Sequence, residues 1–293
     1  LGKASQKAFS LRLDSLKQGM MEHGYIEGEN VSFEYRFADG NLDVLPDLAA
    51  ELQELNMDLV VAAGCPAADA AQQMADSVPV VVYTTNPVTT GLIKSFAHPG
   101  GNITGMTLMT GSEFHSKRVE LLKIIAQSAS LVGVFWNPKI KSHQLSLNEI
   151  TNTAANMGLS ILPLDAQIME DIDRAFETMS SEKPDVLINF GDTIFTANRD
   201  KIANYAVSNQ IPTNFNHAGF VSAGILMSYG PDPEKLFVRM GNYVGKILNG
   251  AKPEDLPVER PSEFDLVLNL NTADTMKLTV PPEILLQATK IIQ

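Results

Sequence analysis

The sequence predicts an α/β protein built from two doubly wound lobes, each an open, mostly parallel sheet with helices on both faces. Apolar runs of strand length alternate with helix-length amphipathic segments along most of the chain. A stretch rich in Gly and Pro, residues 86–111, interrupts this alternation and leaves a series of similar size on either side. We therefore expect two similar lobes with a ligand cleft between them.

The first series begins with a helix, because apolar residues recur every three or four positions between Phe9 and Met20. Val31–Tyr35 alternates between apolar and polar residues, which predicts a strand. The next two strands are continuous apolar runs, typical of strands buried on both faces. The helices of this series are expected at 9–20, 45–55 and 66–75, and the strands at 31–35, 59–63 and 78–83.

The second series repeats the same alternation after residue 113. Strands are expected at 131–136, 159–164, 185–190 and 211–215, and helical stripes at 119–125, 150–157, 172–179 and 202–206. The tail adds a strand at 224–229, a long helix at 236–248 and a strand at 264–270. The last helix and strand are left without an obvious neighbour, so we expect them to complete the first and second lobes, respectively.

Composition excludes several classes of function. The 293 residues hold 22 Lys and Arg against 34 Asp and Glu, a net charge of −12. Such a surface repels phosphate backbones and anionic lipid, which argues against nucleic acid or membrane binding as the main task. No run of eighteen apolar residues occurs. Cys65 is the only cysteine, so a disulfide within the chain and a cysteine zinc site are excluded.

Motifs for catalysis are missing from the sequence. It contains no G-x-S-x-G elbow, no phosphate-binding G-x-x-x-x-G-K-[ST] loop and no G-x-G-x-x-G after a strand. Its five histidines lack the spacing of a metal centre. A doubly wound enzyme would need a cofactor motif or an acid–base pair. We therefore expect no catalytic residue, no cofactor and no metal.

Cys65 follows a predicted strand and opens a helix in which Pro66 occupies the first turn. Its thiol is either a nucleophile favoured by the helix N-terminus or, more in keeping with the missing base, a small buried residue. The backbone N–H groups of Ala67 and Ala68 either face an anion such as a carboxylate or bind only water.

Polar and aromatic residues also follow other predicted strands, and ligands of open α/β sheets sit at the carboxyl ends of strands. Asp192 either pairs with a ligand ammonium or caps a helix, and the two roles are compatible. Tyr83, Phe215 and Tyr229 either stack on a planar ligand or fill the core.

Seven short motifs occur in one order along the chain. They are residues 23–30 (HGYIEGEN), 34–36 (EYR), 99–105 (PGGNITG), 226–232 (LMSYGPD), 247–253 (ILNGAKP), 256–259 (LPVE) and 269–273 (NLNTA). Each alone is weak, but together they resemble the ABC-transporter substrate-binding family of tryptophan/tyrosine type. That family is a branch of the type I periplasmic binding proteins.

The resemblance implies two lobes joined by three crossovers. The N-terminal lobe would hold residues 1–108 and 229–260, and the C-terminal lobe residues 109–228 and 261–293. It also implies a periplasmic or extracellular, membrane-anchored protein, which we expect to be a monomer that delivers a small-molecule ligand to an ABC permease in the membrane. We expect a leader and part of a first strand upstream of Leu1.

The resemblance also implies where the binding loops lie. The first of them, the loop after the family's first strand, corresponds to Lys3, Ala4 and Ser5. The expected ligand-binding residues are Ser5, Gly64, Cys65, Pro66, Ala67, Tyr83, Thr84, Thr85, Asn86, Asp192, Asn214, Phe215 and Tyr229. Two of them depart from the family. Asn86 precedes Pro87 where relatives commonly carry Asp, and Cys65 stands where a hydroxyl residue is common.

The function expected from these features is binding without catalysis. The ligand would be small, amino-acid-like and aromatic, and the lobes would close on it about a hinge. Helix N-terminal N–H groups would hold its carboxylate, and Asp192 would neutralise its ammonium. The alternatives are a nucleoside, a sugar or another small metabolite on the same fold, or the sensor domain of a regulator.

Overall fold

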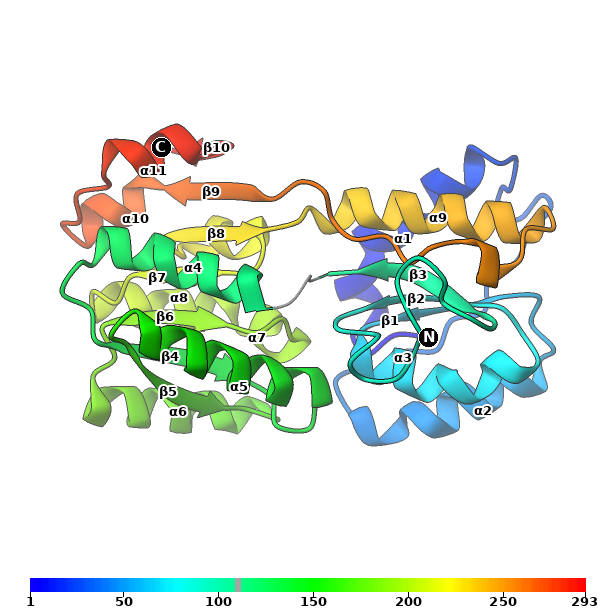
Figure 1. Ribbon diagram of the computed structural model, residues 1–293, viewed down its shortest axis with the longest axis horizontal. Coiled ribbons are helices and arrows are strands. Elements are labelled where there is room, and N and C mark those ends of the chain that lie inside the picture. The colour runs from blue at the N-terminus through cyan, green and yellow to red at the C-terminus, as the bar shows by residue number, and fades with distance from the viewer. Residues whose placement is uncertain (109–111) are drawn as a thin grey trace. The chain divides into compact units, whose positions relative to one another are not determined.

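The computed structural model describes residues 1–108 and 112–293 (Figure 1). The chain divides into two compact units, and each is described by itself. The first unit comprises Leu1–Thr110 and Pro233–Ser262, and the second comprises Gly111–Asp232 and Glu263–Gln293. The sequence places these boundaries after residues 108, 228 and 260. The first of them adjoins residues 109–111, which lie outside the described part of the chain.

The first unit contains a parallel sheet in the order β1 (Val60–Ala63), β2 (Val80–Thr84) and β3 (Ile103–Thr107). Helices cover both of its faces (Figure 1). Val80 and Val82 face α2 (Leu45–Glu54) and α3 (Cys65–Ala71), whereas Val81 and Tyr83 face α1 (Gln6–Met21) and α9 (Pro233–Leu248). This two-sided burial explains why the strands are continuous apolar runs.

Two glycines let α1 and α9 approach each other closely. A Cβ at Gly19 would clash with the carbonyl oxygen of Val238, and one at Gly241 would clash with that of Leu16. The helix at 233–248, which has no neighbour in the sequence order, thus packs backbone to backbone on the first helix of the chain.

The sequence prediction is wrong for two segments of the first unit. Residues 32–36 belong to no strand, although Val31 and Phe37 each form an isolated bridge. The turn-rich stretch 86–111 contains β3, which was not predicted. Strand β3 was missed because it contains Gly105, and a glycine weakens the sequence pattern of a strand. The residue is needed because its φ is +144° and a Cβ there would clash with the carbonyl oxygen of Val82.

The second unit contains a seven-stranded sheet in the order β10–β9–β8–β7–β6–β4–β5. All neighbouring strands are parallel except the pair β8–β9. The strands are β4 (Leu131–Trp136), β5 (Ser160–Asp165), β6 (Val186–Asn189), β7 (Thr213–Phe215), β8 (Met227–Gly230), β9 (Asp265–Asn269) and β10 (Lys290–Ile292). The strand near the C-terminus that lacked a partner in the sequence is β9.

Helices cover both faces of this sheet as well (Figure 1). One face carries α4 (Ser112–Ile125), α5 (Lys141–Asn156), α10 (Leu270–Thr275) and α11 (Pro282–Gln287). The other carries α6 (Met169–Glu182), α7 (Thr193–Ala197) and α8 (Arg199–Ser208). The predicted α/β class with two mostly parallel sheets is therefore confirmed. The short elements α10, α11 and β10 were not predicted.

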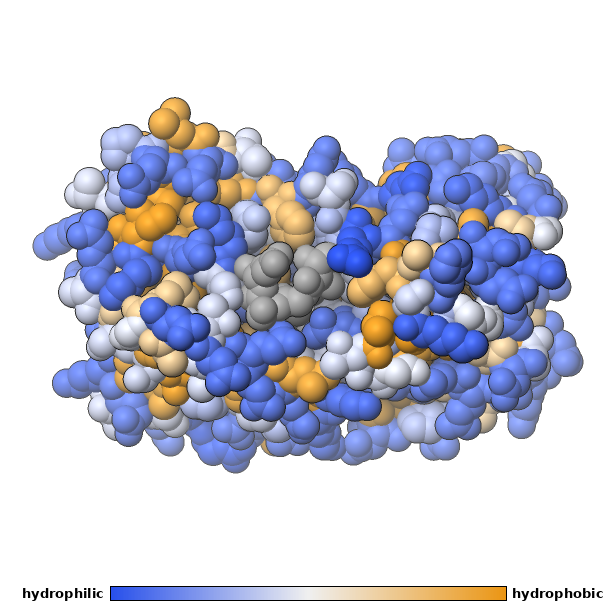
Figure 2. Space-filling view, in the orientation of Figure 1, coloured by the Kyte–Doolittle hydropathy of each residue, from blue (hydrophilic) through white to orange (hydrophobic). Residues whose placement is uncertain are grey.

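Figure 2 shows that hydrophilic side chains cover most of the visible surface, with hydrophobic ones in scattered patches. This agrees with the net charge of −12. Within residues 1–108 and 112–293, no helix combines the length and the apolar composition needed to cross a bilayer.

Candidate ligand-binding site

In the first unit, the predicted site residues gather at the carboxyl ends of β1 and β2. The N–H of Gly64 donates to the carbonyl of Tyr83 at 2.7 Å, which joins the ends of the two strands. Gly64 has a φ of +100°, and the Lys3 side chain lies against it, because a Cβ there would be 3.1 Å from Lys3 Cδ. A lysine stem therefore runs beside the loop that opens α3.

Cys65 and Thr85 meet across these two strand ends. The Sγ of Cys65 lies 2.9 Å from the Oγ1 of Thr85, close enough for a hydrogen bond in which either atom donates. Cys65 is half-buried, whereas Thr84 and Thr85 are buried. The contact between a thiol and a hydroxyl favours a structural role for Cys65 over that of a nucleophile, since a nucleophile needs a base.

The start of α3 offers less to a ligand than the sequence suggests. The N–H of Ala68 donates to the carbonyl of Gly64 at 2.9 Å, so it is used within the helix, and neither of the two alternatives from the sequence, an anion or water, applies to it. The side chains of Ala67 and Ala68 are fully buried. Ala67 can therefore contact a ligand only through its backbone. Pro66 has no N–H, so it can offer a ligand only its carbonyl and the edge of its ring.

Ser5, Asn86 and Tyr83 differ in what they can offer. Ser5 immediately precedes α1 and accepts the N–H of Phe9 at its carbonyl, at 3.1 Å. Asn86 adopts a left-handed φ of +51° in the loop after β2. The Tyr83 ring is buried and packs on Phe237, with ring centroids 4.7 Å apart. Tyr83 therefore fits the core-filling interpretation and not a ligand contact.

In the second unit, Asp192 lies in the loop after β6 and caps α7. Its Oδ1 accepts the N–H of Ile194 at 3.3 Å and the hydroxyl of Thr193 at 3.1 Å. Its Oδ2 accepts Nδ2 of Asn137 at 2.9 Å. The capping role is thus present, and Asn137, which follows β4, orients the second oxygen. Asp192 and Asn137 bring the ends of β6 and β4 together.

Arg118 organises the neighbouring strand ends and was missed in the sequence. It projects from α4 and is fully buried. Its Nη1 donates to the carbonyl of Asn189 at 2.7 Å, and its Nη2 donates to Oδ1 of Asn189 at 3.0 Å and to the carbonyl of Asn214. One side chain therefore ties the end of β6 to the end of β7. The only signal in the sequence was that Arg118 lies four residues from both Phe114 and Leu122, which places the three side chains on one face of a helix.

Three asparagines extend this network. The Nδ2 of Asn214 donates to the carbonyl of Arg118 at 3.2 Å, so the Asn214 side chain points at α4. The Nδ2 of Asn189 donates to Oδ1 of Asn216 at 3.1 Å, and the N–H of Asn216 donates to Oδ1 of Asn189 at 3.2 Å. Asn214 is fully buried, which makes it a support of the loops and not a surface residue.

Burial also sets the charges of this cluster. It lowers the pKa of Arg118 to about 9, which leaves the guanidinium protonated at neutral pH. Burial, and after it the charge of Arg118, holds the pKa of His115 well below its usual value. His115 is therefore neutral. The rings of His115 and His143 both pack on Phe190, so two histidines that are scattered in the sequence are neighbours in space.

The two aromatic residues predicted in the second unit have different surroundings. Phe215 is fully buried among core side chains and packs on Phe220, which fits the core-filling interpretation. Tyr229 is only half-buried and forms a stack with Phe114 and Phe264, at centroid distances of 6.1 and 5.5 Å. Its ring is thus partly accessible at the end of β8. Burial raises the pKa of Tyr229, so its hydroxyl stays neutral.

Metal ligands do not gather in the part of the chain that the structure describes. No three His, Cys, Asp or Glu side chains there lie close enough to hold an ion. The chemistry available at the strand ends is that of a carboxylate, amides, hydroxyls, a lysine and a tyrosine ring. These groups can hold a small polar ligand.

The two compact α/β units and their polar strand ends define a protein with the periplasmic-binding-protein-like fold, as solved structures of such proteins also show. The chain belongs to the family described as "ABC transporter substrate binding protein", which it matches over residues 4–292. The resemblance seen in the short motifs is thereby confirmed. Proteins of this family bind a substrate for transport, so the chain is a binding protein and not an enzyme.

Three known proteins are similar along most of the chain. A tyrosine-binding protein of Clostridioides difficile (strain R20291) is 25% identical over 271 residues, which cover 91% of this chain and 77% of that protein. A conserved domain protein of Vibrio cholerae has a TM-score of 0.91 at 28% identity, covering 99% of this chain and 97% of that one. An ABC domain from Streptococcus pneumonia in complex with L-Trp has a TM-score of 0.90 at 24% identity, with the same coverage.

Proposed function

We propose that this protein is the extracytoplasmic binding component of an ABC importer, and that its ligand is a free amino acid with an aromatic side chain. The supporting observation is the buried carboxylate of Asp192, which Asn137 orients from the end of the neighbouring strand β4. Such a carboxylate can neutralise the ammonium of an amino acid. A buried charge is tolerable only when it is paired, so this contact would favour ligands that carry an amine.

The aromatic preference is supported by Tyr229 and by the relatives. Tyr229 stacks with Phe114 and Phe264 and is the one half-buried ring among the three predicted aromatic contacts. An offset stack of this kind can continue onto a further flat ring. One relative is named for binding tyrosine, and a solved relative holds L-Trp.

For the ligand carboxylate, we propose the first unit. The Lys3 stem lies against Gly64, beside Cys65 and Thr85, so a cation and a hydroxyl occur at the loop between β1 and α3. A ligand that takes its ammonium contact from one unit and its carboxylate contact from the other would hold the two together. Closure about the connecting segments would then signal occupancy to a membrane permease.

The proposal is tested by a thermal-shift series. A ligand that binds only the folded state raises Tm by mass action. We expect L-tyrosine or L-tryptophan to raise Tm. Tyramine, which lacks the carboxylate, and phenylpropionate, which lacks the amine, should raise it far less. Asp192→Asn keeps the hydrogen-bonding shape and removes the charge, so it should weaken amino acid binding at least tenfold. The matched control is Asp173→Asn, at an exposed site on α6.

The same series can contradict the proposal. Asn137, Asn189 and Asn216 supply amides that also suit a hydroxyl-rich ligand. A Tm rise with a sugar or a nucleoside, and none with any amino acid, would replace the aromatic amino acid by that ligand on the same fold. A constant radius of gyration in solution scattering when ligand is added would contradict closure.

A further inference from the structure

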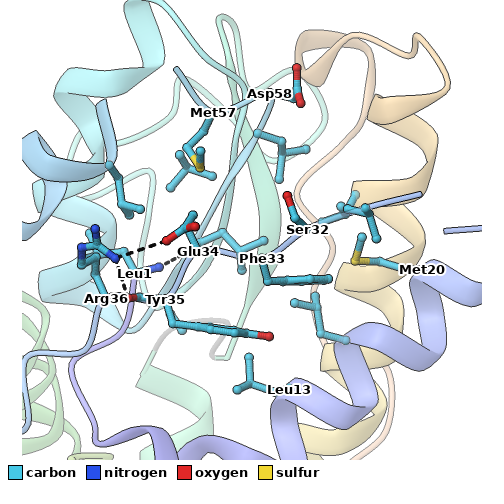
Figure 3. Close-up of a pocket in the computed structure, with 18 of the residues that line it drawn as sticks. Leu1, Leu13, Met20, Ser32, Phe33, Glu34, Tyr35, Arg36, Met57 and Asp58 are labelled. Atoms are coloured by element: carbon cyan, nitrogen blue, oxygen red, sulfur yellow. Dashed lines mark hydrogen bonds and ion pairs between the residues drawn. The ribbon is translucent and has the colours of Figure 1, made fainter. Parts of the chain in front are cut away.

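A cavity of about 170 Å³ lies in the first unit beside the edge strand β1, and Figure 3 shows residues that line it. Leu13 and Met20 of α1 contribute apolar walls together with Met57, and none of the polar side chains on the lining is buried. A specific site fixes its ligand with a few precisely placed polar groups. Buried polar groups of this kind occur in the second unit, next to the carboxylate of Asp192.

His143 is a buried histidine of the second unit that the proposed ligand contacts do not use. It lies in the first turn of α5 and is only 6% exposed. Its ring packs edge-on against Phe190, with ring centroids 5.5 Å apart. Its Nδ1 accepts the N–H of Asn137 at 3.0 Å. An imidazole nitrogen accepts a hydrogen bond only when it carries no proton, so Nδ1 of His143 is unprotonated.

The connection between β4 and α5 brings His143 back to the strand that precedes it. Strand β4 ends at Trp136, and Asn137 follows directly. The N–H of Ile140 donates to the carbonyl of Asn137 at 3.1 Å, and the N–H of His143 donates to the carbonyl of Ile140 at 2.9 Å. The two turns fold the chain back, so the ring of His143 meets the backbone of a residue six positions earlier.

Each polar group of Asn137 has a partner. Its N–H donates to His143, and its carbonyl accepts from Ile140. Its Oδ1 accepts the N–H of Lys139 at 3.0 Å, and its Nδ2 donates to Oδ2 of Asp192 at 2.9 Å. Because Asn137 and Asp192 are both buried, bulk water does not compete for these bonds. The position of the Asn137 amide is therefore fixed from several sides.

We propose that His143 is a positioning residue for the ligand ammonium, acting through Asn137 on the carboxylate of Asp192. The inference rests on the proposed function, in which Asp192 neutralises that ammonium. Nδ1 of His143 holds the Asn137 backbone, and Nδ2 of Asn137 directs Oδ2 of Asp192. The other oxygen of Asp192 accepts the N–H of Ile194 at 3.3 Å. A carboxylate held at both oxygens is pre-organised, so it loses little freedom when a cation binds.

Two substitutions separate positioning from packing. His143→Leu removes the acceptor and keeps an apolar side chain that can pack against Phe190. His143→Asn places an amide oxygen one bond from Cγ, as Nδ1 is, so it can still accept the N–H of Asn137. If the Leu variant does not fold, His143→Gln takes its place, because its amide lies one bond further from the backbone.

Calorimetric titration compares each aromatic amino acid with its 2-hydroxy acid, which carries a hydroxyl in place of the ammonium. The probes are L-tyrosine with 4-hydroxyphenyllactate, and L-tryptophan with indole-3-lactate. We expect the parent to prefer the amino acid, and His143→Leu to reduce that preference about fivefold, the effect of one hydrogen bond. His143→Asn should keep it within about twofold. A purely structural role would weaken both members of a pair equally and leave their ratio unchanged.

Asp192→Asn in the same titrations distinguishes this inference from the proposed function. A preference that is lost in Asp192→Asn but kept in His143→Leu would overturn the role of His143 and leave that of Asp192 intact. An equal loss of both ligands in His143→Leu would overturn it as well, and so would a His143→Asn variant that loses the preference as the Leu variant does. A parent protein that binds neither amino acid would contradict the proposed function itself, and this inference with it.

Discussion

The guanidinium of Arg118 donates from Nη1 to the main-chain carbonyl of Asn189 at 2.7 Å, and both residues are fully buried. A helix side chain therefore holds the end of a central strand, three residues before Asp192. Among the described side chains, no carboxylate pairs with Arg118; its partners are carbonyl and amide oxygens and, at 3.4 Å from Nη1, the Nδ1 of His115. The cation is thus stabilised by dipoles at the strand ends that carry the candidate site.

We predict that Arg118→Met lowers the free energy of unfolding by about 3 kcal/mol, because it removes the guanidinium donors from the buried carbonyls of Asn189 and Asn214. Arg118→Lys keeps the cation and part of the bonding, so it should cost about half as much. Urea denaturation without ligand measures both. A Met variant as stable as the parent would show that the strand ends do not depend on the guanidinium.

The close approach of β3 to β2 predicts a large effect at Gly105. Gly105→Ala should cost about 3 kcal/mol or more, because the new Cβ would clash with the Val82 carbonyl and the φ of +144° is strained for alanine. Gly101→Ala is the matched control: its φ is +115°, but no atom lies within 4 Å of the new Cβ. It should cost only about 1 kcal/mol. If thermal denaturation shows the same loss of stability for Gly105→Ala and Gly101→Ala, the clash with the Val82 carbonyl does not explain the effect.

The contact between Cys65 and Thr85 predicts opposite results for two small replacements. Cys65→Ser keeps a group that can bond to the Thr85 hydroxyl, so ligand affinity should stay within about threefold. Cys65→Val has a similar size but leaves that buried hydroxyl without its partner, at a cost of about 1 kcal/mol. Calorimetric titration and thermal denaturation measure the two effects. If both variants behave alike, the thiol–hydroxyl contact has no role.

The sequence predicts the central strands well, because burial on both faces leaves a continuous apolar run such as 59–63 or 78–83. It misses β3, where Gly105 serves close strand packing and weakens the strand pattern. Asp192 is predictable because a helix cap depends on neighbouring residues. Arg118 is not, because its oxygen partners lie 71 and 96 residues away.

Aromatic residues show a second limit of sequence reasoning. Tyr83, Phe215 and Tyr229 all occur at strand ends, and only the tertiary packing separates them. The first two are buried in the cores of their units, whereas Tyr229 keeps part of its ring exposed. The alternation of side chains along a strand predicts on which face of the sheet a ring lies, but it does not predict which elements cover that face.

Isothermal titration calorimetry of the ligand-stripped protein with L-tyrosine and L-tryptophan tests the proposed function most directly. We expect one molecule of at least one of them to bind per chain with a dissociation constant in the micromolar range or below, and this binding to weaken at least tenfold in Asp192→Asn. The absence of heat with either amino acid, while a sugar or a nucleoside binds to the same preparation, would contradict the account.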